Sequence, residues 1–199
     1  MERIFTYIYE SKCWGDNKNT NYAGSSGAGS DVYYNKKYIE IVKNIIKDYK
    51  INNVVDLGCG DFMIGRLLYD DINVLYTGYD TYKKIIDYHM IQYPEPKYTF
   101  KHLDFYTYKE SIVEGDMCIL KDVIQHWTIE EIYFFLDYLV ESKKFKYILL
   151  VNCCNQKKND ETCNTGEWRP LSINFLPLKK YNPIKIDSYH NKEISIIKV

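Results

Sequence analysis

Short apolar runs alternate with helix-like segments along most of this 199-residue chain, and this alternation limits the folds open to it. Runs typical of buried strands stand at residues 54–57, 74–79, 97–103, 117–120 and 147–151. Strands that are apolar throughout and separated by helices indicate a mostly parallel sheet covered on both faces. Two further runs, at 184–188 and 194–198, predict a closing hairpin. We therefore expect a single-domain α/β fold, with a doubly wound, mostly parallel seven-stranded sheet and an antiparallel C-terminal hairpin.

The helices of this pattern carry their own boundary signals. An apolar stripe at steps of three and four predicts a helix over residues 31–49, with Ser30 as its N-cap. Thr128 and Glu131 form a T-x-x-E capping box at the start of another helix. The helix-like segments that alternate with the strands stand at residues 63–69, 82–92 and 128–142. In a sheet of this kind, the ligand site lies at the carboxyl ends of the strands.

The beginning of the chain differs in composition from the rest. Residues 16–30 are polar and rich in Gly and Ser, which predicts a loop. Large rings at Tyr9 and Trp14 stand beside this loop, and such rings are unusual in a solvated linker. We therefore predict that residues 1–30 form an N-terminal arm and loop that cover a site, while residues 31–199 form the main domain. A flexible arm is the alternative interpretation.

Composition and charge exclude several classes of partner. A net charge of −1 argues against a broad phosphate-binding face, and so against nucleic acid. No apolar run approaches the roughly 20 residues that span a bilayer, and no signal-peptide pattern begins the chain. The six cysteines show no CxxC spacing and no His at ligand spacing, so no metal site is predicted. We expect a cytoplasmic, reduced protein with no membrane partner and no obligate protein partner.

A glycine turn follows the first predicted strand. Asp56 is followed by Gly58 and Gly60, and glycine is the residue that lets a backbone turn tightly beside a ligand. The dinucleotide fingerprint G-x-G-x-x-G fails here, because its third glycine is replaced by Met63. Asp56 also fits poorly beside a pyrophosphate, which its charge repels. A cationic ligand, such as a sulfonium or an amino-acid ammonium group, suits this turn better.

These residues resemble the motifs of class I (Rossmann-like) S-adenosylmethionine-dependent methyltransferases. VVDLGCG at 54–60 is similar to their glycine-rich first motif, and Asp80 stands 20 residues after Gly60. Leu103-Asp104-Phe105 is similar to their third motif, and 116–122 to their fourth strand. The resemblance implies that Asp80 binds ribose hydroxyls, that Asp104 contacts the adenine amino group and that Phe105 packs on the ring. We expect S-adenosylmethionine as cofactor, bound by Trp14, Asp56, Gly58, Gly60, Asp80, Asp104, Phe105 and Lys121.

Each of these residues also has a purely structural interpretation. Asp80 is a possible N-cap for the helix that follows it, and Asp104 a possible turn residue. Gly58 and Gly60 would then serve only a tight strand-to-helix turn. The ordered spacing of the motifs over residues 50–151 favours the cofactor interpretation.

The likeness extends beyond the core motifs. Trp14-Gly15, the segment Ser26–Ser30, Cys59–Phe62 and Gly166–Leu171 follow one another in an order similar to a small group of poorly characterised bacterial and viral methyltransferases. That group carries W-G, S-G-x-G-S, C-G-D-F and G-x-W-R-P-L in this order. The resemblance supports the fold and says little about the methyl acceptor.

Candidate catalytic residues follow the fourth strand. Asp122 and His126 are the candidate bases for an acceptor hydroxyl, with Asp122 favoured, because the His is shifted by one position from that of the plant O-methyltransferases it resembles. A packing or capping role is the alternative for His126. Trp168 and Arg169 are candidates for acceptor binding, through ring stacking and a planar guanidinium. As alternatives, Trp168 fills the core and Arg169 forms a surface ion pair.

We expect O-methylation of a small-molecule or sugar (glycan) hydroxyl. No N/D-P-P-aromatic string, typical of nucleobase amino methylation, stands at residues 121–124. Three alternatives stay open: a catalytically silent binding or regulatory module with this fold, a protein methyltransferase, and a nicotinamide-dependent oxidoreductase. Calorimetric titration with the cofactor and its demethylated product would separate the silent module from a methyltransferase, and the oxidoreductase is expected to bind NAD.

Overall fold

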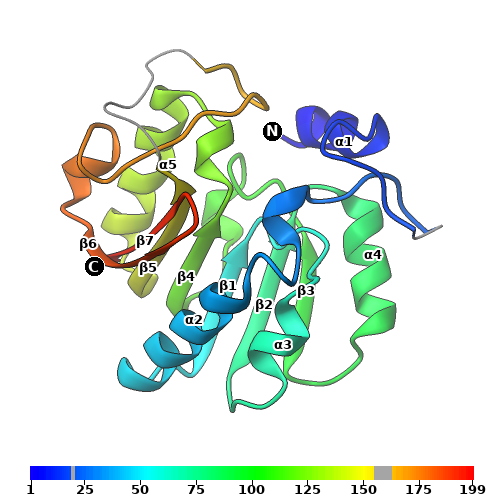
Figure 1. The fold of residues 1–199 in the computed structure, drawn as a ribbon, viewed down its shortest axis with the longest axis horizontal. Helices are drawn as coiled ribbons and strands as arrows, with labels where there is room; N and C mark the ends of the chain where they lie inside the picture. The colour runs from blue at the N-terminus through cyan, green and yellow to red at the C-terminus, as the bar shows by residue number, and fades with distance from the viewer. Residues whose placement is uncertain (19–20, 155–162) are drawn as a thin grey trace.

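A single mixed sheet of seven strands forms the centre of the molecule (Figure 1). The computed structural model of the chain describes residues 1–18, 21–154 and 163–199. The strands are β1 (Asn53–Leu57), β2 (Leu75–Asp80), β3 (Tyr98–His102), β4 (Gly115–Lys121), β5 (Phe145–Cys153), β6 (Ile184–Tyr189) and β7 (Lys192–Lys198). Their order across the sheet is β3-β2-β1-β4-β5-β7-β6. The chain moves outward from β1 to β3, then crosses back to β4, so β1 and β4 meet at the switch point.

The predicted fold class is confirmed. The pairs β1–β2, β2–β3, β1–β4 and β4–β5 are parallel, and the pairs β5–β7 and β6–β7 are antiparallel. All seven predicted strands are present, with ends that differ by a few residues. β4 and β5 are almost wholly buried, as their apolar sequences require of strands covered on both faces.

Helices cover the two faces unequally (Figure 1). The helices α2 (Lys36–Asp48), α3 (Gly65–Tyr69) and α4 (Lys83–Gln92) pack on one face, and α5 (Ile129–Ser142) packs on the other. Between β3 and β4, where a doubly wound fold commonly has a helix, the structure has only the 3₁₀ turn η2 (Lys109–Ser111). The remaining short 3₁₀ turns are η1 (Ala28–Ser30), η3 (Ile124–His126) and η4 (Leu178–Tyr181).

The predicted helix boundaries have mixed outcomes. The capping box is confirmed, since Thr128 Oγ1 accepts from the Glu131 N–H and the Glu131 carboxylate accepts from the Thr128 N–H. The prediction that Ser30 is the N-cap of the helix over 31–49 is wrong, because α2 begins only at Lys36. Asp31 instead accepts the N–H of Tyr34 at 2.9 Å and so closes a separate turn before the helix.

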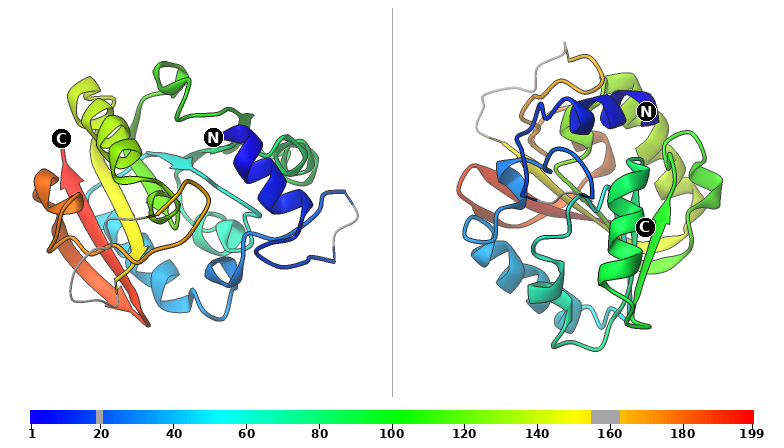
Figure 2. Two further views of the ribbon diagram at one scale, coloured as in Figure 1. Left: turned by 90° about the horizontal axis from the view of Figure 1, so that it is seen from above. Right: turned by 90° about the vertical axis from the view of Figure 1, so that its right-hand side faces the viewer.

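The N-terminal segment contains a helix that the sequence analysis did not predict. Helix α1 (Glu2–Glu10) lies across the edge at which the parallel strands end, as the two views of Figure 2 show. Its buried residues are Ile8 and Tyr9, and Phe5 packs near Trp14 at 5.9 Å between ring centroids. One face of this short helix is therefore held by the rest of the molecule.

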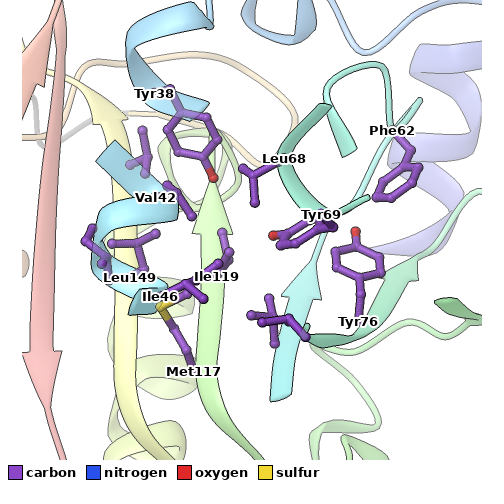
Figure 3. Packing of buried hydrophobic residues seen from close by; sticks show 14 of the residues in the cluster. Tyr38, Val42, Ile46, Phe62, Leu68, Tyr69, Tyr76, Met117, Ile119 and Leu149 are labelled. Atoms are coloured by element: carbon purple, nitrogen blue, oxygen red, sulfur yellow. The ribbon is translucent and has the colours of Figure 1, made fainter. Parts of the chain in front are cut away.

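Two apolar clusters, one on each face of the sheet, form the core. The cluster under α2 and α3 is rich in tyrosine, and Figure 3 shows Tyr38, Tyr69 and Tyr76 around Leu68 in it. The cluster under α5 is built mainly from aliphatic side chains, together with the rings of Tyr79, Phe105, Trp127, Phe135 and Phe145. The six cysteines form no disulfide with one another in the described part of the chain. Among the described residues, no helix is long and apolar enough to cross a bilayer, and no group of His, Cys, Asp and Glu has the arrangement of a metal site.

Candidate functional site

A cavity of about 350 Å³ opens at the carboxyl edge of the parallel strands. This volume lies within the range of small-molecule sites, which is about 300–1,000 Å³. The residues that follow β1, β2, β3 and β4 all contribute to its lining, together with the N-terminal segment and β7. Every residue predicted to bind the cofactor or to act as a base lines this cavity: Trp14, Asp56, Gly58, Gly60, Asp80, Asp104, Phe105, Lys121, Asp122 and His126.

The glycine turn after β1 adopts a backbone that only glycine takes easily. Gly58 has φ 87° and Gly60 has φ 54°, both in the left-handed region. A Cβ on Gly58 would come within 2.6 Å of a methyl of Val123. The turn is tied to β2, because the Gly58 and Cys59 N–H groups both donate to the carbonyl of Tyr79. This backbone therefore lines the cavity without a side chain in the way.

Asp80 stands at the end of β2 and is only 6% exposed. Its carboxylate accepts the N–H of Gly60 at 3.0 Å and the N–H of Tyr82 at 2.9 Å. Burial raises the pKa of Asp80, and the hydrogen bonds from Tyr82 and Gly60 partly oppose that shift. The carboxylate thus joins the glycine turn to the start of α4 and also faces the cavity.

Asp104, after β3, is held by a local turn. Its carboxylate accepts from the N–H and the Oγ1 of Thr107, and from the N–H of Glu2 at the start of α1. Burial opposes ionisation of Asp104, but these hydrogen bonds outweigh it and hold the pKa of the carboxyl below its usual value. The turn role and the cavity position therefore coexist. The ring of Phe105 lies beside it, buried, with its centroid 6.2 Å from that of Trp127.

Asp56 lies deeper, on the face covered by α2 and α3. The Tyr76 hydroxyl donates to its carboxylate at 2.8 Å. Burial raises the pKa of Asp56 to about 6, although that hydrogen bond and the charge of Lys121 work against the shift. The ammonium group of Lys121 donates to the Gly29 carbonyl at 2.7 Å and to Asp122 at 2.9 Å.

Asp122 lies between two lysines. Its carboxylate forms ion pairs with Lys121 and with Lys192, a residue of β7 that is only 3% exposed. Burial alone would raise the pKa of Asp122, but the two ammonium groups lower it below its usual value. Asp122 also has φ 59°, a strained conformation for a residue with a side chain. A carboxylate held ionised in this way is a weak proton acceptor.

His126 is placed differently. Its Nδ1 lies 2.8 Å from the backbone carbonyl of Glu167, and its ring centroid lies 4.9 Å from that of Trp14. Burial lowers the pKa of His126, which keeps the imidazole neutral near pH 7. Because a carbonyl only accepts, Nδ1 carries the proton and Nε2 carries a lone pair. Within the described part of the chain, Nε2 has no hydrogen-bond partner, and His126 is one of the residues that line the cavity.

The loop before α2 covers the glycine turn. Asp61 accepts from the Ser26 N–H and from the Ser30 hydroxyl, while the Asp61 N–H donates to Ser26 Oγ. Tyr9 shares a hydrogen bond of 2.8 Å with the same Ser26 hydroxyl. Asp61 stands in the C-G-D-F motif of the sequence, and no role was predicted for it. The pairing of an acid beside the turn with a serine-rich loop was the signal that would have found it.

The two residues predicted to bind the acceptor, Trp168 and Arg169, lie in different surroundings. Trp168 lines the cavity and is 54% exposed, which leaves its ring open to a ligand. Arg169 is 2% exposed and lies outside the cavity lining, and its Nη2 donates to the carbonyl of Trp127 at 2.7 Å. This placement differs from the prediction that Arg169 binds the acceptor, because a buried guanidinium engaged with the backbone does not reach the cavity. The segment 155–162 before it lies outside the described residues.

Comparison of the whole fold with solved structures gives many matches, and those described below are distant in sequence. The methyltransferase domain of bacterial CtHen1 matches with a TM-score of 0.60 at 15% identity, covering 83% of this chain and 100% of that chain. The chain has the fold of class I methyltransferases. Human N-acetylserotonin methyltransferase in complex with SAM has a TM-score of 0.59 at 15% identity, covering 80% of this chain and 51% of that one.

Two further matches with this methyltransferase fold come from longer proteins. PigF, solved with SAH, has a TM-score of 0.65 at 8% identity, covering 84% of this chain and 56% of that chain. An O-methyltransferase family protein from Burkholderia thailandensis has a TM-score of 0.59 at 13% identity, covering 82% of this chain and 55% of that one. No protein-family model matches the chain, and no curated protein matches it in sequence. The similarity is therefore one of fold.

Proposed function

We propose that this chain is an S-adenosylmethionine-dependent methyltransferase that methylates a hydroxyl group of a small molecule or sugar. The observation that carries the proposal is the meeting of the glycine turn, Asp80 and Asp104 in one cavity with a neutral imidazole, that of His126. A cofactor cradle and a proton acceptor thus share one space.

The residues present fit the cofactor on several counts. Gly58 and Gly60 offer a backbone surface that a Cβ would block. Asp80 presents carboxylate oxygens suited to a ribose diol, and the flat ring of Phe105 suits a base. Trp127 Nε1 is buried with no partner among the described residues. A buried donor without an acceptor destabilises the fold, and a ligand that supplies an acceptor removes this cost. A purine offers ring nitrogens that accept.

S-adenosylmethionine supplies an electrophilic methyl on a sulfonium sulfur, which leaves as a neutral thioether and needs no acid. The protein must align the acceptor oxygen and remove its proton. His126 Nε2 accepts the hydroxyl proton as the O–CH₃ bond forms, which makes the imidazole a cation beside Asp122. Asp122, already ionised between Lys121 and Lys192, stabilises that cation through space. This assignment reverses the preference for Asp122 as the base.

The acceptor class follows from the rings near His126. Trp14 lies against the imidazole, and Trp168 stands half exposed in the cavity lining. Rings in these positions suit a flat or sugar-like acceptor that stacks while its hydroxyl reaches Nε2. Among proteins of similar fold, one is named as an O-methyltransferase family protein, and another, WbdD, as a bifunctional kinase-methyltransferase.

Calorimetric titration tests the cofactor assignment. The wild-type chain should bind S-adenosylhomocysteine and should not bind NAD. Gly58→Ala should weaken the binding of S-adenosylhomocysteine, because the added Cβ would press on Val123. A melting curve of this variant should show that it is folded. Binding of NAD in place of S-adenosylhomocysteine would overturn the assignment.

Transfer of a labelled methyl group tests the reaction. The wild-type chain should label at least one hydroxyl compound in a set containing catechol, methyl glucoside and a nucleotide sugar. A chain that binds S-adenosylhomocysteine but labels none of these compounds supports the silent binding module instead. Label in an added protein mixture alone supports the protein methyltransferase alternative.

A further inference from the structure

Residues 164–169, which we name the histidine strap, run alongside the turn η3 that carries His126. The Gly166 N–H donates to the carbonyl of His126 at 2.8 Å, and the Arg169 N–H donates to the carbonyl of Gln125 at 3.1 Å. In return, the carbonyl of Glu167 lies 2.8 Å from His126 Nδ1. Strap and turn thus form a short two-way ladder, although 41 residues separate His126 from Glu167.

The strap is held rigid by contacts of its own. Asn164 donates to the Glu167 carboxylate from both its backbone N–H and its side-chain amide. The Thr165 hydroxyl donates to the Glu131 carboxylate at 2.7 Å, at the capped start of α5. These bonds fix the turn that presents the Glu167 carbonyl to the imidazole.

Gly166 and Arg169 anchor the strap to its surroundings. Gly166 has φ 92°, and a Cβ there would come within 2.7 Å of Ile4 on α1. Arg169 Nη2 donates to the carbonyl of Trp127, the residue after His126. Gly166 and Arg169 both belong to the G-x-W-R-P-L motif of the sequence. We therefore assign this motif to the histidine strap and not to acceptor binding by Arg169.

We propose that the histidine strap is a positioning element that fixes His126 as the Nδ1–H tautomer and so keeps the Nε2 lone pair directed into the cavity. The proposal rests on the proposed function for its catalytic consequence, but the tautomer is a property of the free protein. Glu167 acts through its carbonyl, and Thr165, Gly166 and Arg169 act through the strap. None of these four touches the reacting atoms.

Two charged groups also face His126 and bear on its protonation. Asp122 favours the imidazolium, and Lys192 disfavours it. Because these two oppose one another, burial and the Glu167 carbonyl decide the state of the ring. A variant that loosens the strap should therefore change the tautomer of His126 while the ion pair between Asp122 and Lys192 stays intact.

Nitrogen-15 NMR of histidine side chains tests the first half of the proposal in the free protein. At pH 7 the His126 signal, assigned by its loss in His126→Gln, should show a protonated Nδ1 and an unprotonated Nε2. A protonated Nε2, or a ring carrying both protons, would overturn the proposal. This readout does not depend on cofactor binding, so it stands even where S-adenosylhomocysteine fails to bind and the proposed function fails.

Variants of the strap test the second half. Thr165→Val removes the hydroxyl that donates to Glu131 and should shift part of His126 toward the Nε2–H tautomer, lowering kcat about fivefold, the effect of one hydrogen bond, with KM little changed. Gly166→Ala should act in the same direction and more strongly. Thr99→Val, at an exposed position on β3, is the matched control and should change neither signal nor rate. A wild-type tautomer in both Thr165→Val and Gly166→Ala would refute the role of the strap.

Discussion

The cavity has two ends, and they are built in different ways. At the β1–β2–β3 end, the functional groups sit on the last residue of a strand or within the two residues after it, as with Gly58, Asp80 and Asp104. At the β4–β5–β7 end, the groups depend on partners far along the chain. Lys192 reaches Asp122 across 70 residues, and the Glu167 carbonyl reaches His126 across 41.

Under the proposed function, this difference separates cofactor binding from the chemistry at the acceptor. The first end is fixed by the parallel sheet itself, since the carboxyl ends of neighbouring strands meet at one edge. The second end needs the antiparallel strand β7 and the strap to be in place together, while α1 contacts both ends, through the Glu2 N–H at Asp104 and through Ile4 at Gly166. The first end suits a ligand that many proteins share. The second end suits an acceptor that is particular to one protein, because the residues of its loops can differ between proteins while the sheet stays the same.

Loss of the His126 imidazole should give the largest effect and should fall on one end only. His126→Ala is expected to lower the rate of methyl transfer about 10²–10⁴-fold, the usual contribution of a general base. Its affinity for S-adenosylhomocysteine should stay within a fewfold of wild type, because the imidazole lies at the acceptor end.

Rates with the acceptor that the wild-type chain labels, together with calorimetry, check this expectation. His190→Ala, an exposed histidine at the turn between β6 and β7, is the control and should behave as wild type. A wild-type rate in His126→Ala would remove the base from this residue and return the role to Asp122.

Asp80→Asn should affect the other end. An amide cannot accept from both the Gly60 and Tyr82 N–H groups as the carboxylate does, so the turn loses part of its support and the cavity loses a charge-assisted acceptor. The affinity for S-adenosylhomocysteine should fall about 10–100-fold. Asp87→Asn, exposed on α4, should leave the affinity unchanged in the same titration. Equal affinities in Asp80→Asn and wild type would separate Asp80 from the cofactor site.

The two ends also differ in how far the sequence reveals them. The strands and the carboxylates that follow them were predictable, because apolar runs and strand-end residues are local signals. The partners of Asp122 were not, since nothing near Lys192 in the sequence marks it as a buried lysine. Helix α1 was not predicted, because the polar, Gly/Ser-rich composition of residues 16–30 led us to predict an arm and loop over the whole N-terminal segment. The helical spacing of Ile4 and Phe5 with Ile8 and Tyr9 was the signal for it.

Lys192→Met should weaken the fold at the acceptor end. Methionine keeps the length of the side chain but leaves the Asp122 carboxylate with Lys121 as its one cation, so we expect about 2 kcal/mol of lost stability near pH 7. The lowered pKa of Asp122 means that its ion pairs stabilise the fold above the unfolded pKa and are lost as the pH falls through the folded one.

Denaturant melts of Lys192→Met at pH 7 and pH 3 measure that loss. The gap from wild type should narrow at the lower pH, because the Asp122 carboxyl of the unfolded chain, with its ordinary pKa of about 4, takes up a proton there. Lys179→Met, exposed in η4, should show no gap at either pH. A gap that stays constant with pH would mean that Lys192 acts through packing alone.

Asp56 gives the smallest effect and the opposite sign, because its pKa is raised to about 6 by burial rather than lowered. A raised pKa means that the fold favours the protonated acid, so stability from this group is present below the unfolded pKa, about 4, and is lost as the pH rises through about 6. Asp56→Asn should therefore stabilise the chain by about 1 kcal/mol at pH 8 and by almost nothing at pH 4, while weakening S-adenosylhomocysteine binding a fewfold. Paired melts at the two pH values, with exposed Glu114→Gln as the control, measure the difference. A stabilised variant with unchanged binding would mean that the acid beside the glycine turn has no part in holding the cofactor, and that the cofactor end, like the acceptor end, depends on more than its local motif.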